Sequence, residues 1–136
     1  MPQFKKLTPN LFVASVERSL AFYENLLGFE RGMTVPEKSP FVFAQVTSGS
    51  VEIFFNDTAA AMKENPVLVG NLRGPGGNTM FIELDGGGSV DALHLRLQPA
   101  VKVVMPLVTQ WYGMREFAIE DPDGYVITFA ERVSPS

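Results

Sequence analysis

Two similar hairpin-like segments constrain the fold more than any other feature of the sequence. FAQVTSGSVEIFF occupies residues 43–55 and FAIEDPDGYVITF occupies residues 117–129. In each, two runs rich in β-branched and aromatic residues flank a turn, Ser48-Gly49-Ser50 in the first and Asp121–Gly124 in the second. A strand–turn–strand unit that recurs in this way predicts an internally duplicated fold.

The surrounding segments extend each hairpin into the same larger pattern. Ser15 is a good N-cap for a helix with an apolar stripe through Leu27, and Gly28 suits its left-handed C-cap. Ser89 is the predicted cap of a second helix, which Pro99 stops. The predicted strands are 7–14, 29–35, 41–47, 51–55, 78–85, 101–105, 115–120 and 125–131, and the predicted helices are 16–27, 58–65 (closed by Pro66) and 90–98.

These elements predict an α+β fold of two βαβββ modules. The modules are about 1–57 and about 78–136, with a connector at about 58–77, and together they form one domain. Neither module alone covers both faces of its sheet. We therefore expect a curved, barrel-like mixed sheet with helices outside and a cavity inside, where ligands tend to bind.

Composition narrows the range of functions. The 136-residue chain has a net charge of −4 and no basic run, so nucleic acid is an unexpected partner. No apolar run approaches the ~18 residues of a membrane span, and MPQFKKLTPN (1–10) lacks the apolar segment of a signal peptide, so neither is expected. The absence of cysteine excludes disulfides, thiolate metal sites and a cysteine nucleophile. We expect a cytoplasmic protein.

Glu52 has two interpretations. If Val51, Ile53 and Phe55 pack against helices, Glu52 and Phe54 face the cavity. An unpaired carboxylate there would be desolvated, its pKa would rise, and it could act as a general base. The alternative is a half-exposed glutamate paired with an arginine, for which Arg115 is a candidate.

Aromatic residues are the other candidate ligand contacts. Trp111 and Tyr112 precede Gly113 in a loop-like segment, where they either stack on a planar ligand or pack in the core. The phenylalanines have the same two interpretations. The full set of candidate ligand-binding residues is Phe41, Phe43, Glu52, Phe54, Phe81, Trp111, Tyr112, Arg115 and Thr128.

Three other motifs are assigned no chemistry. His94 follows Leu93 in its helix and is expected on the surface, away from the apolar stripe. RGPGGN (73–78) lacks the Lys-Ser/Thr and the following helix of a phosphate loop. Asp121–Gly124 fails the calcium-loop spacing, since Ile119 and Ala130 fall at ligand positions, and is predicted to be a turn with its carboxylates in water.

SVERSLAFYENLLGFE (15–30) and WYGMREFAIEDPDGYVITF (111–129), with the repeated βαβββ order, resemble the vicinal oxygen chelate superfamily. That group contains glyoxalase I, extradiol dioxygenases and bleomycin-resistance proteins. The resemblance implies paired βαβββ modules and a homodimer. It also implies four metal-ligand positions, which fall at Thr8, Glu52, Phe81 and Thr128. Of these, only Glu52 is a competent ligand, so neither a metal nor another cofactor is expected.

The leading hypothesis is a metal-independent binding protein of the bleomycin-resistance, antibiotic-sequestering type. Its ligand would be a small aromatic or drug-like molecule. The alternative is a glyoxalase- or dioxygenase-related enzyme, either with a metal on other ligands or with Glu52 as general base. A third possibility is a partner-binding module without a small ligand.

Overall fold

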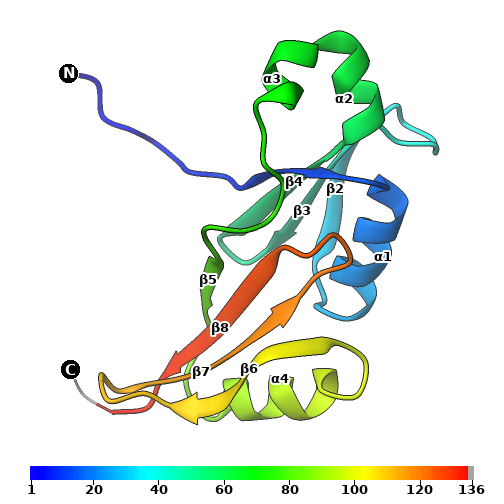
Figure 1. The fold of residues 1–136 in the computed structure, drawn as a ribbon. Helices are drawn as coiled ribbons and strands as arrows, with labels where there is room; N and C mark the ends of the chain where they lie inside the picture. The colour runs from blue at the N-terminus through cyan, green and yellow to red at the C-terminus, as the bar shows by residue number, and fades with distance from the viewer. Residues whose placement is uncertain (135–136) are drawn as a thin grey trace. The chain divides into compact units, whose positions relative to one another are not determined.

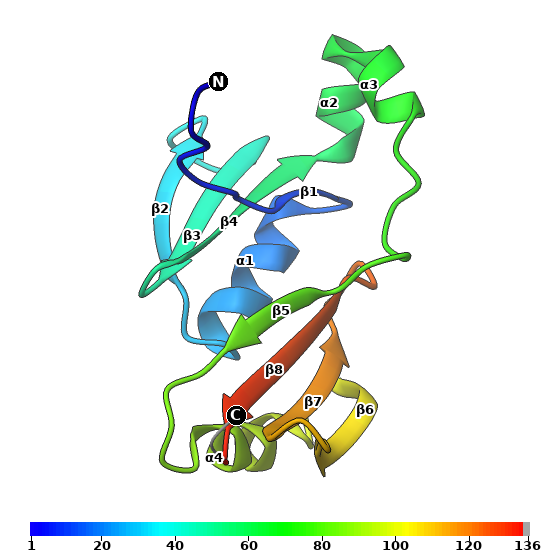
Figure 2. The same cartoon turned by 90° about the vertical axis from the view of Figure 1, so that its left-hand side faces the viewer.

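The computed structural model describes residues 1–134, which fold as two compact units, one of residues 1–72 and one that begins at Arg73. Each unit contains a four-stranded mixed sheet with a helix packed on one face (Figures 1 and 2). The two units repeat the order βαβββ, so the predicted α+β fold of duplicated modules is confirmed. Each sheet is curved but remains open, so neither is a closed barrel. Whether the two units form one domain stays a prediction.

Unit 1 is built on a sheet with the strand order β1-β4-β3-β2. Strand β1 runs parallel to β4, and the other neighbours are antiparallel. The elements of this unit are β1 (Asn10–Val13), α1 (Val16–Asn25), β2 (Glu30–Val35), β3 (Phe43–Ser48), β4 (Val51–Asp57), α2 (Thr58–Glu64) and α3 (Pro66–Gly70).

Helix α1 has the caps that its sequence predicts. The Arg18 N–H donates to Ser15 Oγ at 3.2 Å, which satisfies one of the free amides of the first turn. Gly28 has a φ of 74°, and the Phe29 N–H reaches back to the Tyr23 carbonyl at 3.0 Å. These caps fix where the helix begins and ends.

The face of α1 that contacts the sheet is apolar and closely packed. The Tyr23 ring lies 4.8 Å from that of Phe55 and 5.7 Å from that of Phe29. Ile53 and Phe55 are buried, as predicted. Because side chains alternate along a strand, Glu52 and Phe54 lie on the opposite, helix-free face of this sheet.

Helix α3 was not predicted. Pro66 was expected only to close α2, but it is the first residue of α3, where its missing N–H costs no hydrogen bond. The Asn65 side chain caps this helix by accepting from the Leu68 N–H at 3.3 Å.

Unit 2 repeats the topology of unit 1 with the strand order β5-β8-β7-β6. Strand β5 is parallel to β8, and the remaining pairs are antiparallel. The elements are β5 (Met80–Glu83), α4 (Ser89–Leu97), β6 (Lys102–Thr109), β7 (Met114–Glu120) and β8 (Val126–Arg132). Strand β6 continues to Thr109, beyond the predicted end at residue 105.

The predicted cap of α4 was wrong. Ser89 is the first helical residue, and its side chain makes no capping hydrogen bond. The buried carboxylate of Glu131 on β8 accepts instead from the Gly88 and Val90 N–H groups, both at 2.8 Å. These hydrogen bonds, above all that from Val90, hold the pKa of Glu131 below its ordinary value.

The prediction for His94 was also wrong. Its ring lies 5.0 Å from the buried Phe117 ring in an edge-to-face arrangement, and the residue is half-buried. His94 follows Val90 by four positions and precedes Leu97 by three. It therefore belongs to the stripe that packs on the sheet.

The turn at Asp121–Gly124 is confirmed. Asp121 Oδ1 accepts from the Asp123 and Tyr125 N–H groups, each at 2.9 Å, and Gly124 has a φ of 91°. The prediction that its carboxylates lie in water fails for Asp121, which is buried because its side chain organises the turn.

Across residues 1–134, no helix is long and apolar enough to cross a membrane.

The Glu131 cap yields a stability prediction. Glu131→Gln should lower the melting temperature at pH 7 by about 2–8 °C, because the single oxygen of an amide cannot accept from both N–H groups as the two carboxylate oxygens do. The folded-state pKa is depressed, so the carboxylate stabilises the fold above its ordinary pKa of 4.5 and loses this effect as the pH falls through the lowered value. Melting curves of the variant should therefore vary less with pH in this acid range. The exposed Glu83→Gln is the control, and an equal shift in both variants would contradict the cap.

Candidate functional site

Three side chains converge on Glu52 at the helix-free face of unit 1. Oε1 accepts from Thr8 Oγ1 at 2.8 Å and lies 2.6 Å from Lys6 Nζ. Oε2 accepts from Gln45 Nε2 at 2.5 Å. The Glu52 side chain is only 10% exposed, so its charge is compensated mainly by these neighbours.

This environment lowers the pKa of Glu52 to about 2. The hydrogen bond from Lys6 is the largest cause, followed by those from Gln45 and Thr8, and together they outweigh desolvation. The interpretation of Glu52 as an unpaired carboxylate with a raised pKa was therefore wrong, and the structure has the alternative, a paired carboxylate. A carboxylate with a pKa near 2 is a weak base at neutral pH, which removes the basis for Glu52 as general base.

The partner of Glu52 also differs from the one suggested by the sequence. Arg115 lies in unit 2, where Nε pairs with Asp91 Oδ1 at 2.9 Å and Nη1 donates to Thr109 Oγ1 at 2.9 Å. Lys6 takes the position that was suggested for arginine.

Gln45 was not predicted as a site residue, although its side chain links the site to strand β2. Its Oε1 accepts from the Met33 N–H at 3.1 Å, while its amide nitrogen donates to Glu52. A Cβ on Gly32 would lie 2.5 Å from Gln45 Oε1, so glycine is what allows this side chain to cross β2. Thr47 pairs with Glu52 across the hairpin, and this register places Gln45 on the same face. That register is the signal that could have identified Gln45.

Two predicted aromatic residues lie on the same face as Glu52. The rings of Phe43 and Phe54 are 5.1 Å apart in an edge-to-face arrangement, and both residues are half-buried. Phe41 lies elsewhere: its N–H donates to Glu17 of α1 at 2.7 Å, and the Arg31 guanidinium stands 5.6 Å from its ring. The structure thus brings Phe43 and Phe54 together with Glu52 and places Phe41 beside α1.

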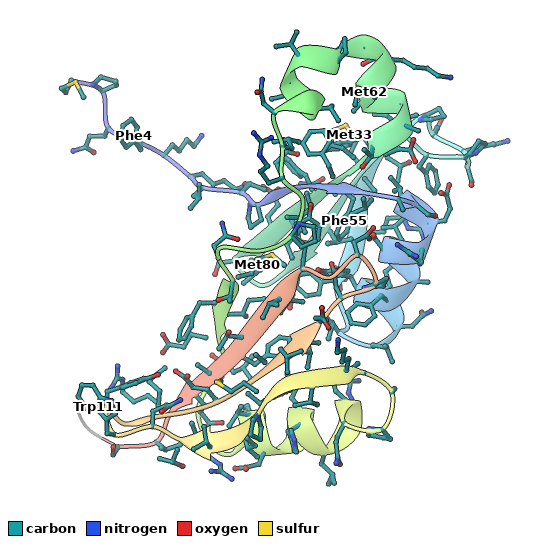
Figure 3. All side chains as sticks on the ribbon, in the orientation of Figure 1. Phe4, Met33, Phe55, Met62, Met80 and Trp111 are labelled. Atoms are coloured by element: carbon teal, nitrogen blue, oxygen red, sulfur yellow. The ribbon has the colours of Figure 1, made fainter. Side chains whose placement is uncertain are left out.

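The aromatic candidates of unit 2 are exposed. Trp111 is 93% exposed at the end of the β6–β7 hairpin (Figure 3), and its ring lies 5.2 Å from that of Tyr112. Exposure rules out core packing for Trp111, while ligand stacking stays a prediction. The Tyr112 hydroxyl donates to Glu116 Oε2 at 2.9 Å, and desolvation together with this carboxylate raises its pKa.

The remaining candidates, Phe81 and Thr128, are cross-strand neighbours on β5 and β8. Phe81 is 56% exposed, whereas Thr128 is buried and its hydroxyl lies 3.4 Å from that of Thr79.

The residues at the four implied metal positions do not fit a metal ion. Thr8 and Glu52 are adjacent, but the ammonium of Lys6 already neutralises the carboxylate. Phe81 has no donor atom, and the Thr128 hydroxyl is a poor ligand. Elsewhere in residues 1–134, no cluster of three or more His, Asp or Glu side chains could hold a metal.

The sequence matches a family model across residues 5–129, which is most of the chain. The model describes the Glyoxalase/Bleomycin resistance protein/Dioxygenase superfamily. The chain belongs to this superfamily. No protein of curated function matches the sequence.

Solved structures with this superfamily fold are similar to the chain at low sequence identity. A glyoxalase/bleomycin resistance protein/dioxygenase from Nocardioides aligns with a TM-score of 0.77 and 16% identity, over 100% of this chain and 88% of that one. Lactoylglutathione lyase from Agrobacterium tumefaciens aligns with a TM-score of 0.69 and 17% identity, over 96% and 95%. The bleomycin-binding protein from bleomycin-producing Streptomyces verticillus, complexed with copper(II)-bleomycin, aligns with a TM-score of 0.62 and 24% identity, over 100% of both chains. At these identities the likeness shows the superfamily fold alone.

The contact between Gly32 and Gln45 gives a test of the polar cluster. In Gly32→Ala the new Cβ should displace the flexible Gln45 side chain and leave Glu52 one hydrogen bond short. The pKa of Glu52 should then rise from about 2 towards its ordinary value of 4.5, as measured by NMR titration of the side-chain carboxyl. Gly70→Ala, where a Cβ meets nothing within 4 Å, is the matched control. An unchanged Glu52 pKa in a folded Gly32→Ala protein would contradict the role assigned to Gln45.

Proposed function

We propose that this protein binds a small aromatic or planar molecule without using a metal ion. The observation that carries the proposal is the position of Lys6 Nζ, 2.6 Å from Glu52 Oε1. Glu52 is the one competent ligand among the four metal positions that the resemblance implies. The side-chain ammonium of Lys6 supplies positive charge at this position, but unlike a metal ion it has no coordination position for a substrate. These residues therefore favour binding over metal-assisted chemistry.

The helix-free face of unit 1 has suitable binding groups. Phe43 and Phe54 form an edge-to-face pair that keeps part of its surface exposed, and aromatic side chains bind planar ligands at a low cost in conformational entropy. The low pKa of Glu52 supports a fixed negative charge beside them rather than a proton acceptor. The net charge of −4 adds weak steering of a cationic ligand.

Binding alone is sufficient for a biological effect. A protein that sequesters a toxic compound lowers its free concentration by mass action, as is proposed here for an antibiotic-like ligand. The bleomycin-binding protein of Streptomyces verticillus, solved with copper(II)-bleomycin, is a precedent for this fold. We further propose a cytoplasmic homodimer in which the exposed Trp111 and Tyr112 contribute to ligand contacts.

Metal analysis tests the metal-independent part of the proposal. Protein purified without chelators and then dialysed should contain far less than one equivalent of Ni, Zn, Fe or Mn by elemental analysis. Added Ni²⁺ or Zn²⁺ should not raise the melting temperature, because ligand binding to the folded state would otherwise stabilise it. One equivalent of metal that survives dialysis would overturn this proposal.

A substitution at Phe54 tests the aromatic site. Phe54→Leu should weaken binding of an aromatic probe about two- to tenfold, which corresponds to the roughly 0.5–1.5 kcal/mol of an aromatic contact. Affinity would be measured by NMR titration with 3-phenylpropan-1-ol. Phe4→Leu makes the same change at a residue that is 91% exposed and should have no effect. Equal affinities in the two variants would rule out the Phe43–Phe54 face as the site.

A further inference from the structure

Lys6 reaches Glu52 from a segment that is otherwise extended and exposed. Residues 1–7 precede β1 and contain no helix or strand. Met1, Phe4 and Leu7 are each more than 90% exposed, and Phe4 lies well away from the sheet (Figure 3). The Lys6–Glu52 ion pair is therefore the main contact between this N-terminal segment (residues 1–7) and the sheet.

We propose that Lys6 is a displaceable counter-ion, and that the natural ligand carries a cationic amine that replaces it on Glu52. This inference rests on the proposed small-molecule binding function. It adds the chemical class of the ligand, an aromatic amine, and a competitive role for the N-terminal segment.

The carboxylate is held in place independently of Lys6. Thr8 donates to Oε1, and Gln45 donates to Oε2 while its own carbonyl is fixed by the Met33 N–H. When Lys6 leaves, Glu52 keeps its orientation and gains a free position on Oε1. A site that is already ordered loses little entropy on binding.

Charge determines which groups can replace Lys6. Glu52 is largely removed from solvent, and an unpaired carboxylate in such a place is unfavourable. A neutral or anionic group would leave that charge uncompensated, whereas an ammonium would restore the ion pair. The exchange therefore selects for a cation.

Lys6 itself is suited to leave. Its side chain is 56% exposed, and lysine is a flexible, strongly hydrated ion. The neighbouring Leu7 and Phe4 do not bury their side chains against the sheet. Release of Lys6 therefore breaks one ion pair and exposes no apolar core.

The position of the aromatic pair indicates the spacing within the ligand. Glu52 and Phe54 lie two residues apart on β4, which corresponds to roughly 7 Å along a strand. An aromatic ring separated from an amine by a three-carbon linker spans a similar distance. We therefore use 3-phenylpropylamine as the probe and its neutral analogue 3-phenylpropan-1-ol for comparison.

The test measures the affinity of both probes at pH 7 for the full-length protein and for Lys6→Ala. The amine should bind more tightly than the alcohol. Removal of the competing ammonium should raise amine affinity up to about fivefold, the effect expected of a partly exposed ion pair, and should leave alcohol affinity unchanged. Lys5→Ala is the matched control, since it makes the same change in net charge at the adjacent residue.

A second measurement uses the unaltered protein. Saturation with 3-phenylpropylamine should increase the fast backbone motion of residues 4–6 in NMR relaxation experiments, because the ion pair between Lys6 and Glu52 is lost. The alcohol should leave that motion unchanged.

Several results would overturn the inference. Weaker amine binding in Lys6→Ala, or equal gains in Lys5→Ala and Lys6→Ala, would show that Lys6 does not compete for Glu52. Equal binding of alcohol and amine would refute the cationic ligand and leave the proposed aromatic binding function intact. If neither probe binds any of these proteins, the aromatic site fails together with the inference.

Discussion

The pairing register between β3 and β4 is the constraint on which the rest of unit 1 depends. Val46 pairs with Ile53 and faces α1, whereas Thr47 pairs with Glu52 on the helix-free face. A slip of one residue would exchange these two faces, burying a carboxylate against α1 and exposing Phe55. The apolar core therefore fixes the register, and the register places the groups of the candidate site.

The two hairpins look alike in sequence, but their connections differ, and this changes which residues share a face. Gly49 and Ser50 connect the first hairpin, whereas residues 121–125 connect the second. Phe43 consequently lies on the helix-free face, while Phe117, which begins the matching FA dipeptide, packs against His94 of α4. Duplication thus preserves topology and hairpin position without preserving the role of each residue.

Local patterns in the sequence were enough to predict most of the helices, strands and turns. The caps at Ser15 and Gly28, the alternation through Glu52 and the turn at Asp121 each depend on residues close together in the chain. The failures involve long-range partners. Glu131 caps α4 from 41 residues away, and Lys6 approaches Glu52 only after β1 pairs with β4. Neither the propensity of a residue nor a short spacing identifies such a partner. The sequence therefore predicted Glu52 as a candidate, left open whether its carboxylate was paired, and suggested Arg115 rather than Lys6 as the partner.

That environment also explains why the same residue supports one function better than another. A glutamate that coordinates a metal, one that acts as a base and one that binds a cation are indistinguishable in sequence. They differ in what approaches their oxygens. Here Gln45 and Thr8 donate hydrogen bonds and Lys6 donates a full positive charge, so the carboxylate stays ionised and oriented well below neutral pH. A fixed anion beside a pair of aromatic rings can attract and orient a cationic ligand, and the exposed Lys6 can exchange with it. The pattern of hydrogen bonds around Glu52 thus carries functional information that its position in the superfamily alone does not.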